Sequence, residues 1–360
     1  MRCIIRLLLI LSFISLFLSD AQAFEIKQAE TITVSVFVSP DSSFSTSKTF
    51  AKKSKLIRQL TQARTIPATA DPSWIRATLT VKKRSYLYDH DGRLFTADKK
   101  KLLLLPKQAA AQIETCVRKV EQQHYGSLTP WNEVKLSFQR KDYATVVDLE
   151  TGKRFNVQRR AGSRHADVQP LTKRDTSIMK EMYQGKWSWK RRAIRVEVDG
   201  KSFAASMHGM PHGAGAIRGN AFPGHFCIHF YGSSTHRRRD PDPSHSLMIT
   251  KAAGILPQTL MAATPEEIVS YFLTSLNEHD FHTLGMLTAG NPLPDELQAV
   301  DTLKRPLPVS FSEGDLLVEA TLLAEYFTNE GKSQKELWRV VLQRFSPWER
   351  WKITHVETNE

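Results

Sequence analysis

The chain has 360 residues, of which 41% are hydrophobic and 24% charged, with 17 Gly and 17 Pro. This composition excludes a disordered, collagen-like or low-complexity chain, and the length suits two or three domains. Three cysteines exclude a disulfide-rich scaffold, and the formal net charge of +13 favours an anionic partner.

Residues 1–23 have the pattern of a secretory signal peptide. Arg2 and Arg6 flank the start of an apolar stretch at 7–18, and Ala21-Gln22-Ala23 matches a cleavage site. The stretch is shorter than the ~20 residues of a membrane span, so we expect no membrane span after cleavage. Secretion to the cell wall or periplasm excludes nucleic acid as a partner and favours peptidoglycan or another anionic wall polymer.

The charge changes sign along the chain. Residues 151–260 carry 19 Lys and Arg against 7 Asp and Glu, whereas residues 261–360 carry 8 against 16. The reversal, bracketed by Pro257 and Thr264-Pro265, predicts a domain boundary. The fold class expected is α+β and multidomain, with an α+β accessory domain over 24–140, a mostly β domain over 141–258 and an α+β domain over 263–360.

The N-terminal third is predicted to combine strands with an amphipathic helix. Cys116 falls on the apolar face of a helix over 108–124, which predicts a small buried side chain that does not pair with Cys227. The other elements expected here are a strand at 31–38, a loop over 39–75 with a short helix near 53–64, and a hairpin whose arms are 76–88, 93–97 and 101–105.

The middle of the chain reads as two hairpins and a long irregular stretch. The hairpins cover 144–160 and 193–207, with turns at Thr151-Gly152 and Asp199-Gly200. A short helix is expected over 172–184, the tryptophans Trp187 and Trp189 are expected to anchor the core, and the irregular stretch 207–247 contains one short strand at 227–231.

The last hundred residues start with a helix and continue as strands. Thr264, Pro265 and Glu267 form a capping box that predicts a helix over 264–277. Strands follow at 317–330 and 335–356, the second interrupted at Ser346-Pro347. With the sequences TPEEIVSYFLTSLNEHDFHTL and RWKITHVE, this order resembles the nuclear-transport-factor-two-like superfamily, which implies an α+β cone over 263–360.

Histidines concentrate in the middle region around one cysteine. Six of the 12 histidines lie between residues 208 and 245, and Cys227 lies among them in the sequence GHFCIHF. In a strand, His225 and Cys227 share a face, and an imidazole beside a thiol can take its proton. Upstream, His165 and Asp167 form a His–carboxylate pair that can orient a catalytic imidazole. The six are His208, His212, His225, His229, His236 and His245.

The spacing around Cys227 resembles the L,D-transpeptidases of the YkuD type. His208 is followed, after residues 209–223, by Gly224, His225, Phe226, Cys227, Ile228 and His229. The resemblance implies acyl transfer on peptidoglycan stem peptides, by transpeptidation or hydrolysis and without a cofactor. It implies Cys227 as nucleophile, His225 as its base and His208 lining the site, with Gly209, Gly224, His229, His165 and Asp167 as substrate-binding or supporting residues. Gly224, Phe226 and His229 stand where the family has Ser or Thr, Gly, and Asn or Arg.

Two other interpretations stay open. His165, Asp167, His225 and His229 are residue types that bind zinc, which would make the protein a zinc-dependent wall peptidase. Alternatively, the chain is a cell-wall-binding protein without catalytic activity.

Overall fold

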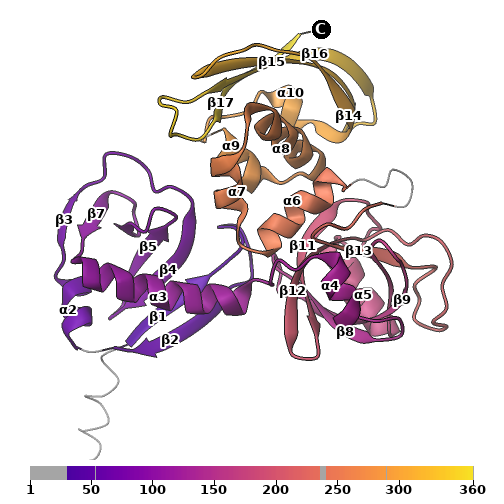
Figure 1. The fold of residues 1–360 in the computed structure, drawn as a ribbon, viewed down its shortest axis with the longest axis horizontal. Coiled ribbons are helices and arrows are strands. Elements are labelled where there is room, and N and C mark those ends of the chain that lie inside the picture. The colour runs from indigo at the N-terminus through magenta and orange to yellow at the C-terminus, as the bar shows by residue number, and fades with distance from the viewer. Residues whose placement is uncertain (1–30, 53, 236–240, 289, 360) are drawn as a thin grey trace, which may run out of the picture. The chain divides into compact units, whose positions relative to one another are not determined.

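The computed structural model describes residues 31–359 except 53, 236–240 and 289 (Figure 1). The predicted signal peptide at 1–23 and His236 lie outside the described residues. Within them, residues 31–36 and 46–121 form one compact unit, and residues 37–45 and 122–359 form another. Both units mix helices with mostly antiparallel strands. None of the helices in these ranges is long and apolar enough to cross a membrane.

The first unit is built on an antiparallel sheet with strand order β2-β1-β4-β5-β6-β7-β3. Its core includes Cys116 on helix α3, which is 2% exposed and lies beside the buried side chains of Ile113 and Val117, as the helical periodicity predicts. The elements are β1 (Thr31–Val36), β2 (Thr46–Ala51), α2 (Ser54–Thr61), β3 (Arg64–Pro67), β4 (Ile75–Val81), β5 (Arg84–Asp89), β6 (Leu94–Thr96), β7 (Lys101–Leu104) and α3 (Lys107–His124).

Two predictions for this unit are wrong. The single strand expected over 76–88 is the hairpin of β4 and β5, which reverses at Lys82 and Lys83 with φ angles of +45° and +67°. No Gly, Pro or Asn marks this turn, so the alternation of side chains hides it. The stretch 39–75, expected to be a loop with one helix, also contains the strands β2 and β3.

The second unit contains a closed barrel with strand order β10-β13-β12-β11-β8-β9 (Figure 1). The hairpin turns fall where predicted, with positive φ angles at Gly152, Asp199 and Gly200. The barrel elements are α4 (Trp131–Ser137), β8 (Tyr143–Asp148), β9 (Arg154–Ala161), β10 (Ala166–Pro170), α5 (Lys173–Met182), β11 (Arg191–Val198), β12 (Lys201–His208) and β13 (Phe226–Phe230).

The barrel interior is apolar, and this places the polar side chains outside. All six strands contribute to one buried core cluster, and β13 contributes Phe226, Ile228 and Phe230. Side chains alternate between the two faces of a strand, so Cys227 and His229 face outward from the barrel wall. The chemistry of this region therefore lies on the outer face of the barrel.

Helix α6 (Pro243–Ala252) packs across β11 and β12 on this outer face (Figure 1). The first turn of α6 lies within the stretch 207–247. That stretch was expected to be irregular, so the expectation is wrong for its last residues. The helix starts where Asp242 accepts a hydrogen bond from the amide of His245 at 3.1 Å, with Pro243 as the first helical residue.

The rest of the second unit contains short helices and an antiparallel sheet of order β14-β15-β16-β17. The predicted capping box is present, since Thr264 and Glu267 each accept from the other's backbone amide. The strand predicted over 335–356 is interrupted as expected, but β14 was not predicted. The elements are α7 (Leu256–Ala262), α8 (Pro265–Glu278), α9 (Phe281–Leu287), α10 (Asp295–Gln298), β14 (Val300–Phe311), β15 (Leu317–Thr328), β16 (Ser333–Gln343) and β17 (Lys352–Asn359).

A buried ion pair ties α6 to its neighbours. Lys251 Nζ lies 2.8 Å from Asp280 Oδ2 and 3.5 Å from Glu150 Oε1. Burial by itself lowers the pKa of Lys251, but the two carboxylates more than offset this and raise it. The pair is therefore charged at neutral pH and links α6 to the residues before α9 and to the turn between β8 and β9.

Candidate active site

Strands β10, β12 and β13 bring the predicted site residues together on the outer face of the barrel. Asp167 on β10 lies directly opposite Cys227 on β13, and Ser206 on β12 lies opposite His229. Helix α6 adds His245. We call the following set the outer-face cluster: His165, Asp167, Ser206, His208, His212, His225, Cys227, His229 and His245.

The loop between β12 and β13 folds back so that His212 lies beside His225. The two residues exchange backbone hydrogen bonds, with N···O distances of 2.9 and 2.8 Å. Gly224 makes this possible: its φ is +102°, and a Cβ there would lie 2.4 Å from the His212 carbonyl oxygen. At the start of the loop, a Cβ on Gly209 would lie 2.5 Å from the Tyr183 ring. Both glycines support the loop through close packing.

His212 lies within hydrogen-bonding distance of the thiol. Its Nε2 lies 3.4 Å from Cys227 Sγ, and its Nδ1 lies 3.1 Å from the carbonyl oxygen of Met210. Because a carbonyl only accepts, Nδ1 carries the proton, and the Nε2 lone pair faces the thiol. Burial lowers the pKa of His212, so this ring is neutral at pH 7.

The thiol itself rests protonated. Burial, and then Asp167, raise the pKa of Cys227 well above its ordinary value. Cys227 is 5% exposed, and its Sγ lies 3.7 Å from Asp167 Oδ1. The resting pair is therefore a thiol beside a neutral imidazole, with the proton still on sulfur.

Asp167 contacts two further imidazoles. Its Oδ1 lies 3.1 Å from His165 Nε2 and 4.0 Å from His225 Nε2. Both histidines place Nδ1 2.9 Å from a backbone carbonyl oxygen, as His212 does at 3.1 Å. His165 and His225 thus turn Nε2 toward Asp167, and His212 turns Nε2 toward Cys227.

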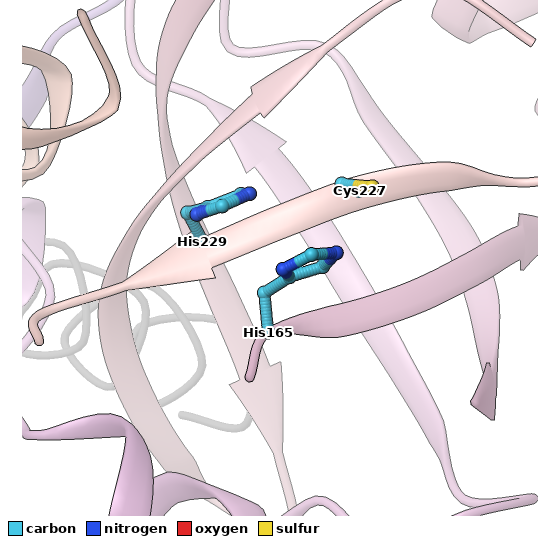
Figure 2. Close-up of side chains that lie close together, drawn as sticks. All are labelled: His165, Cys227 and His229. Atoms are coloured by element: carbon cyan, nitrogen blue, oxygen red, sulfur yellow. The ribbon is translucent and has the colours of Figure 1, made fainter. Parts of the chain in front are cut away.

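Behind Cys227, three buried imidazoles form a stack. His165 and His229 lie 4.4 Å apart at an interplanar angle of 20°, and Figure 2 shows both rings beside Cys227. His229 and His245 lie 3.9 Å apart at 14°, and His245 Nδ1 lies 2.9 Å from Ser206 Oγ. Burial lowers the pKa of His245 well below 6.5, so this ring is neutral.

His208 joins the two halves of the cluster, and a tryptophan covers it. Burial, and then His212, lower the pKa of His208 well below 6.5. Its ring lies 5.2 Å from that of His212 and 4.7 Å from that of Trp189. Trp189 is 50% exposed, so its prediction as a core anchor is wrong, whereas Trp187 packs against the barrel core. Trp189 forms an exposed wall beside the two imidazoles.

The predicted site residues lie close together, but their contacts differ from those that their spacing in the sequence suggests. His225 shares the outer face with Cys227 and its Nε2 lies 4.0 Å from Asp167 Oδ1, whereas Nε2 of His212 lies 3.4 Å from the thiol sulfur. Phe226 points into the barrel, where it is fully buried against Phe222 and Phe155. Its side chain therefore takes no place in the cluster.

Sequence reasoning did not place His212, His245 or Trp189 among the site residues. A signal for His245 exists, because Asp242-Pro243 is a helix-start pattern that places His245 in the first turn of a helix. No spacing rule singles out His212, whose position depends on the reversal of the loop at Gly224. Cys116 and Cys227 are both free thiols, as expected.

Comparison of the chain with protein-family models, with curated proteins and with solved structures gives no match.

Proposed function

We propose that the protein is a secreted cysteine acyltransferase, similar in chemistry to L,D-transpeptidases, that acts on peptidoglycan stem peptides by transpeptidation or hydrolysis. The observation that carries this proposal is the 3.4 Å contact between Cys227 Sγ and His212 Nε2. The Met210 carbonyl holds the ring in the tautomer that accepts a proton. A nucleophile and an oriented base are the two groups that thiol acyl transfer requires.

The chemistry uses side chains alone. Cys227 Sγ attacks the amide carbonyl carbon while its proton moves to His212 Nε2, and Asp167 favours the imidazolium that forms. The C–N bond then breaks, and the leaving amine takes the proton from His212. The resulting thioester is attacked by a second amine or by water, which gives up a proton to His212, and the thiol is restored as the acyl group leaves.

The substrate class rests on compartment and charge. The sequence pattern at residues 1–23 supports secretion, and residues 151–260, which hold the barrel, carry 19 Lys and Arg against 7 Asp and Glu. Anionic wall polymers are the partner that such a surface attracts outside the cell. In this proposal the barrel is an L,D-transpeptidase-like domain, and residues 263–360 form a nuclear-transport-factor-two-like domain for interaction or positioning.

Intact mass after incubation with a carbapenem tests the nucleophile, because L,D-transpeptidases as a family are acylated by these compounds. We expect one covalent adduct on the wild-type protein and on Cys116→Ala, whose thiol lies in the core of the first unit. Cys227→Ala should give none. No adduct from folded protein with a titratable Cys227 would overturn the proposal, and retained binding to purified sacculi would then favour the wall-binding interpretation.

The rate of adduct formation separates the two candidate bases. His212→Ala should slow acylation about 10²- to 10⁴-fold, the usual contribution of a positioned general base. His225→Ala should slow it far less, because Nε2 of that ring lies 4.0 Å from Asp167, whereas Nε2 of His212 lies 3.4 Å from the sulfur. Equal rates in the two variants would show that His212 is not the base.

A further inference from the structure

Cys227 lies among donor atoms that suit a thiophilic metal ion. Cys227, Asp167 and His225 each place one donor atom within 4.8 Å of the other two, and so do Cys227, His208 and His212. Sγ lies 3.4 Å from His212 Nε2 and 3.7 Å from Asp167 Oδ1, and that oxygen lies 4.0 Å from His225 Nε2.

Two of these separations are close to the edges of a tetrahedral zinc site. Zinc binds nitrogen and oxygen at about 2.1 Å and sulfur at about 2.3 Å, so neighbouring ligand atoms at a tetrahedral angle lie about 3.4 to 3.6 Å apart. The observed distances from Sγ to Asp167 Oδ1 and from that oxygen to His225 Nε2, 3.7 and 4.0 Å, need shifts of about half an ångström or less.

The group behind the His225 imidazole also fits a metal site. His225 donates from Nδ1 to the Ala214 carbonyl at 2.9 Å. Metal-binding histidines are commonly fixed in this way by a backbone carbonyl, which leaves Nε2 for the metal. A thiolate from Cys227 and the carboxylate of Asp167 together balance the two positive charges of the ion.

We propose that Cys227, Asp167 and His225 bind one divalent thiophilic metal ion, Zn²⁺, and that this ion silences the nucleophile. On binding, the sulfur–metal bond forms and the thiol proton is released to solvent. The ion then occupies the sulfur, the atom that attacks the acyl carbon in the proposed reaction. The silencing, although not the metal site, rests on the proposed function.

Titration of the metal-free protein with Co²⁺ tests the site without an activity assay. We expect one Co²⁺ per chain, with a thiolate-to-cobalt charge-transfer band and the intense visible bands of tetrahedral cobalt. The near-isosteric Cys227→Ser should lose the charge-transfer band, and Asp167→Asn should weaken binding at least tenfold. Cys116→Ala should behave as wild type. A wild-type protein that gives no such band, or a Cys227→Ser variant that keeps it, overturns the site.

Carbapenem acylation with and without Zn²⁺ tests the silencing. Saturating Zn²⁺ should slow adduct formation at least tenfold, and a chelator should restore the rate. An unchanged rate in zinc-loaded protein overturns silencing, as does wall-peptide hydrolysis by the zinc-loaded protein alone. If metal-free protein with a titratable Cys227 forms no adduct, the acyltransferase function and its silencing both fail, and the Co²⁺ titration still decides the metal site.

Discussion

Replacing Lys251 with Met should cost the second unit a large part of its stability. Lys251 is 4% exposed, and its Nζ lies 2.8 Å from the carboxylate of Asp280, which is 8% exposed. At this distance the attraction is about 6 kcal/mol for an effective dielectric constant of about 20, before the cost of desolvation is subtracted. Removing one partner leaves a buried charge uncompensated, so we expect the free energy of unfolding to fall by about 3–5 kcal/mol.

Urea unfolding followed by tryptophan fluorescence measures this loss, with Lys304→Met as the matched control. The Lys304–Glu325 pair has a separation of 3.3 Å, but its side chains are 54% and 38% exposed, so water screens the pair and its loss should have only a small effect. Adding Asp280→Asn to Lys251→Met removes the stranded charge and should recover much of the stability. If Lys251→Met costs no more than Lys304→Met, the reasoning from burial is wrong.

Two further predictions concern the outer-face cluster. His208 and His245 stay neutral in the folded protein, with pKa values well below 6.5, so the unfolded chain binds more protons as the pH falls below 6.5. The free energy of unfolding should therefore drop by up to about 1.4 kcal/mol per pH unit for each histidine, and urea midpoints that are equal at pH 7 and pH 5 would contradict this. Gly224→Ala should cost at least about 1–3 kcal/mol in backbone strain and slow the acylation of Cys227, because the new Cβ displaces the His212 carbonyl. Gly219→Ala, at φ +77° with no atom within 4 Å of the new Cβ, should leave the acylation rate unchanged, and equal rates in the two variants would refute the role of Gly224.

Many of the helices, strands and turns could be predicted from the sequence because their signals are local. Three such signals depend on residues that are close together in the sequence, and all three structures are present. They are the apolar stripe around Cys116, the capping box at Thr264 and the turn at Asp199-Gly200. The reversal at Lys82-Lys83 was missed because ordinary residues adopt left-handed backbone there. Closure of the barrel depends on pairing between β10 and β9 and between β10 and β13, which no local pattern reports.

The same distinction holds for the candidate site. Alternation along β13 is local, and it places Cys227 on the face opposite the core residue Phe226. The choice of His212 over His225 as the partner of the thiol depends on the backbone bridge that joins them across the loop. Pairing of Asp167 with Cys227 likewise depends on the register of two strands sixty residues apart along the chain. Composition and spacing can indicate which residues belong to such a site, but they do not show which of these residues contact one another.

Because side chains alternate along β13, the residues that fill the barrel core and the residues of the outer-face cluster occupy different positions of one short strand. Phe226 and Ile228 fill the barrel, whereas Cys227 and His229 lie on its outer face, so one wall of backbone lies between the two sets. Volume-conserving exchanges at the inner positions can alter the melting behaviour while the spacing of the outer groups is kept. The inner positions therefore offer a route to a more robust protein in which the reactive groups keep their residues and their register.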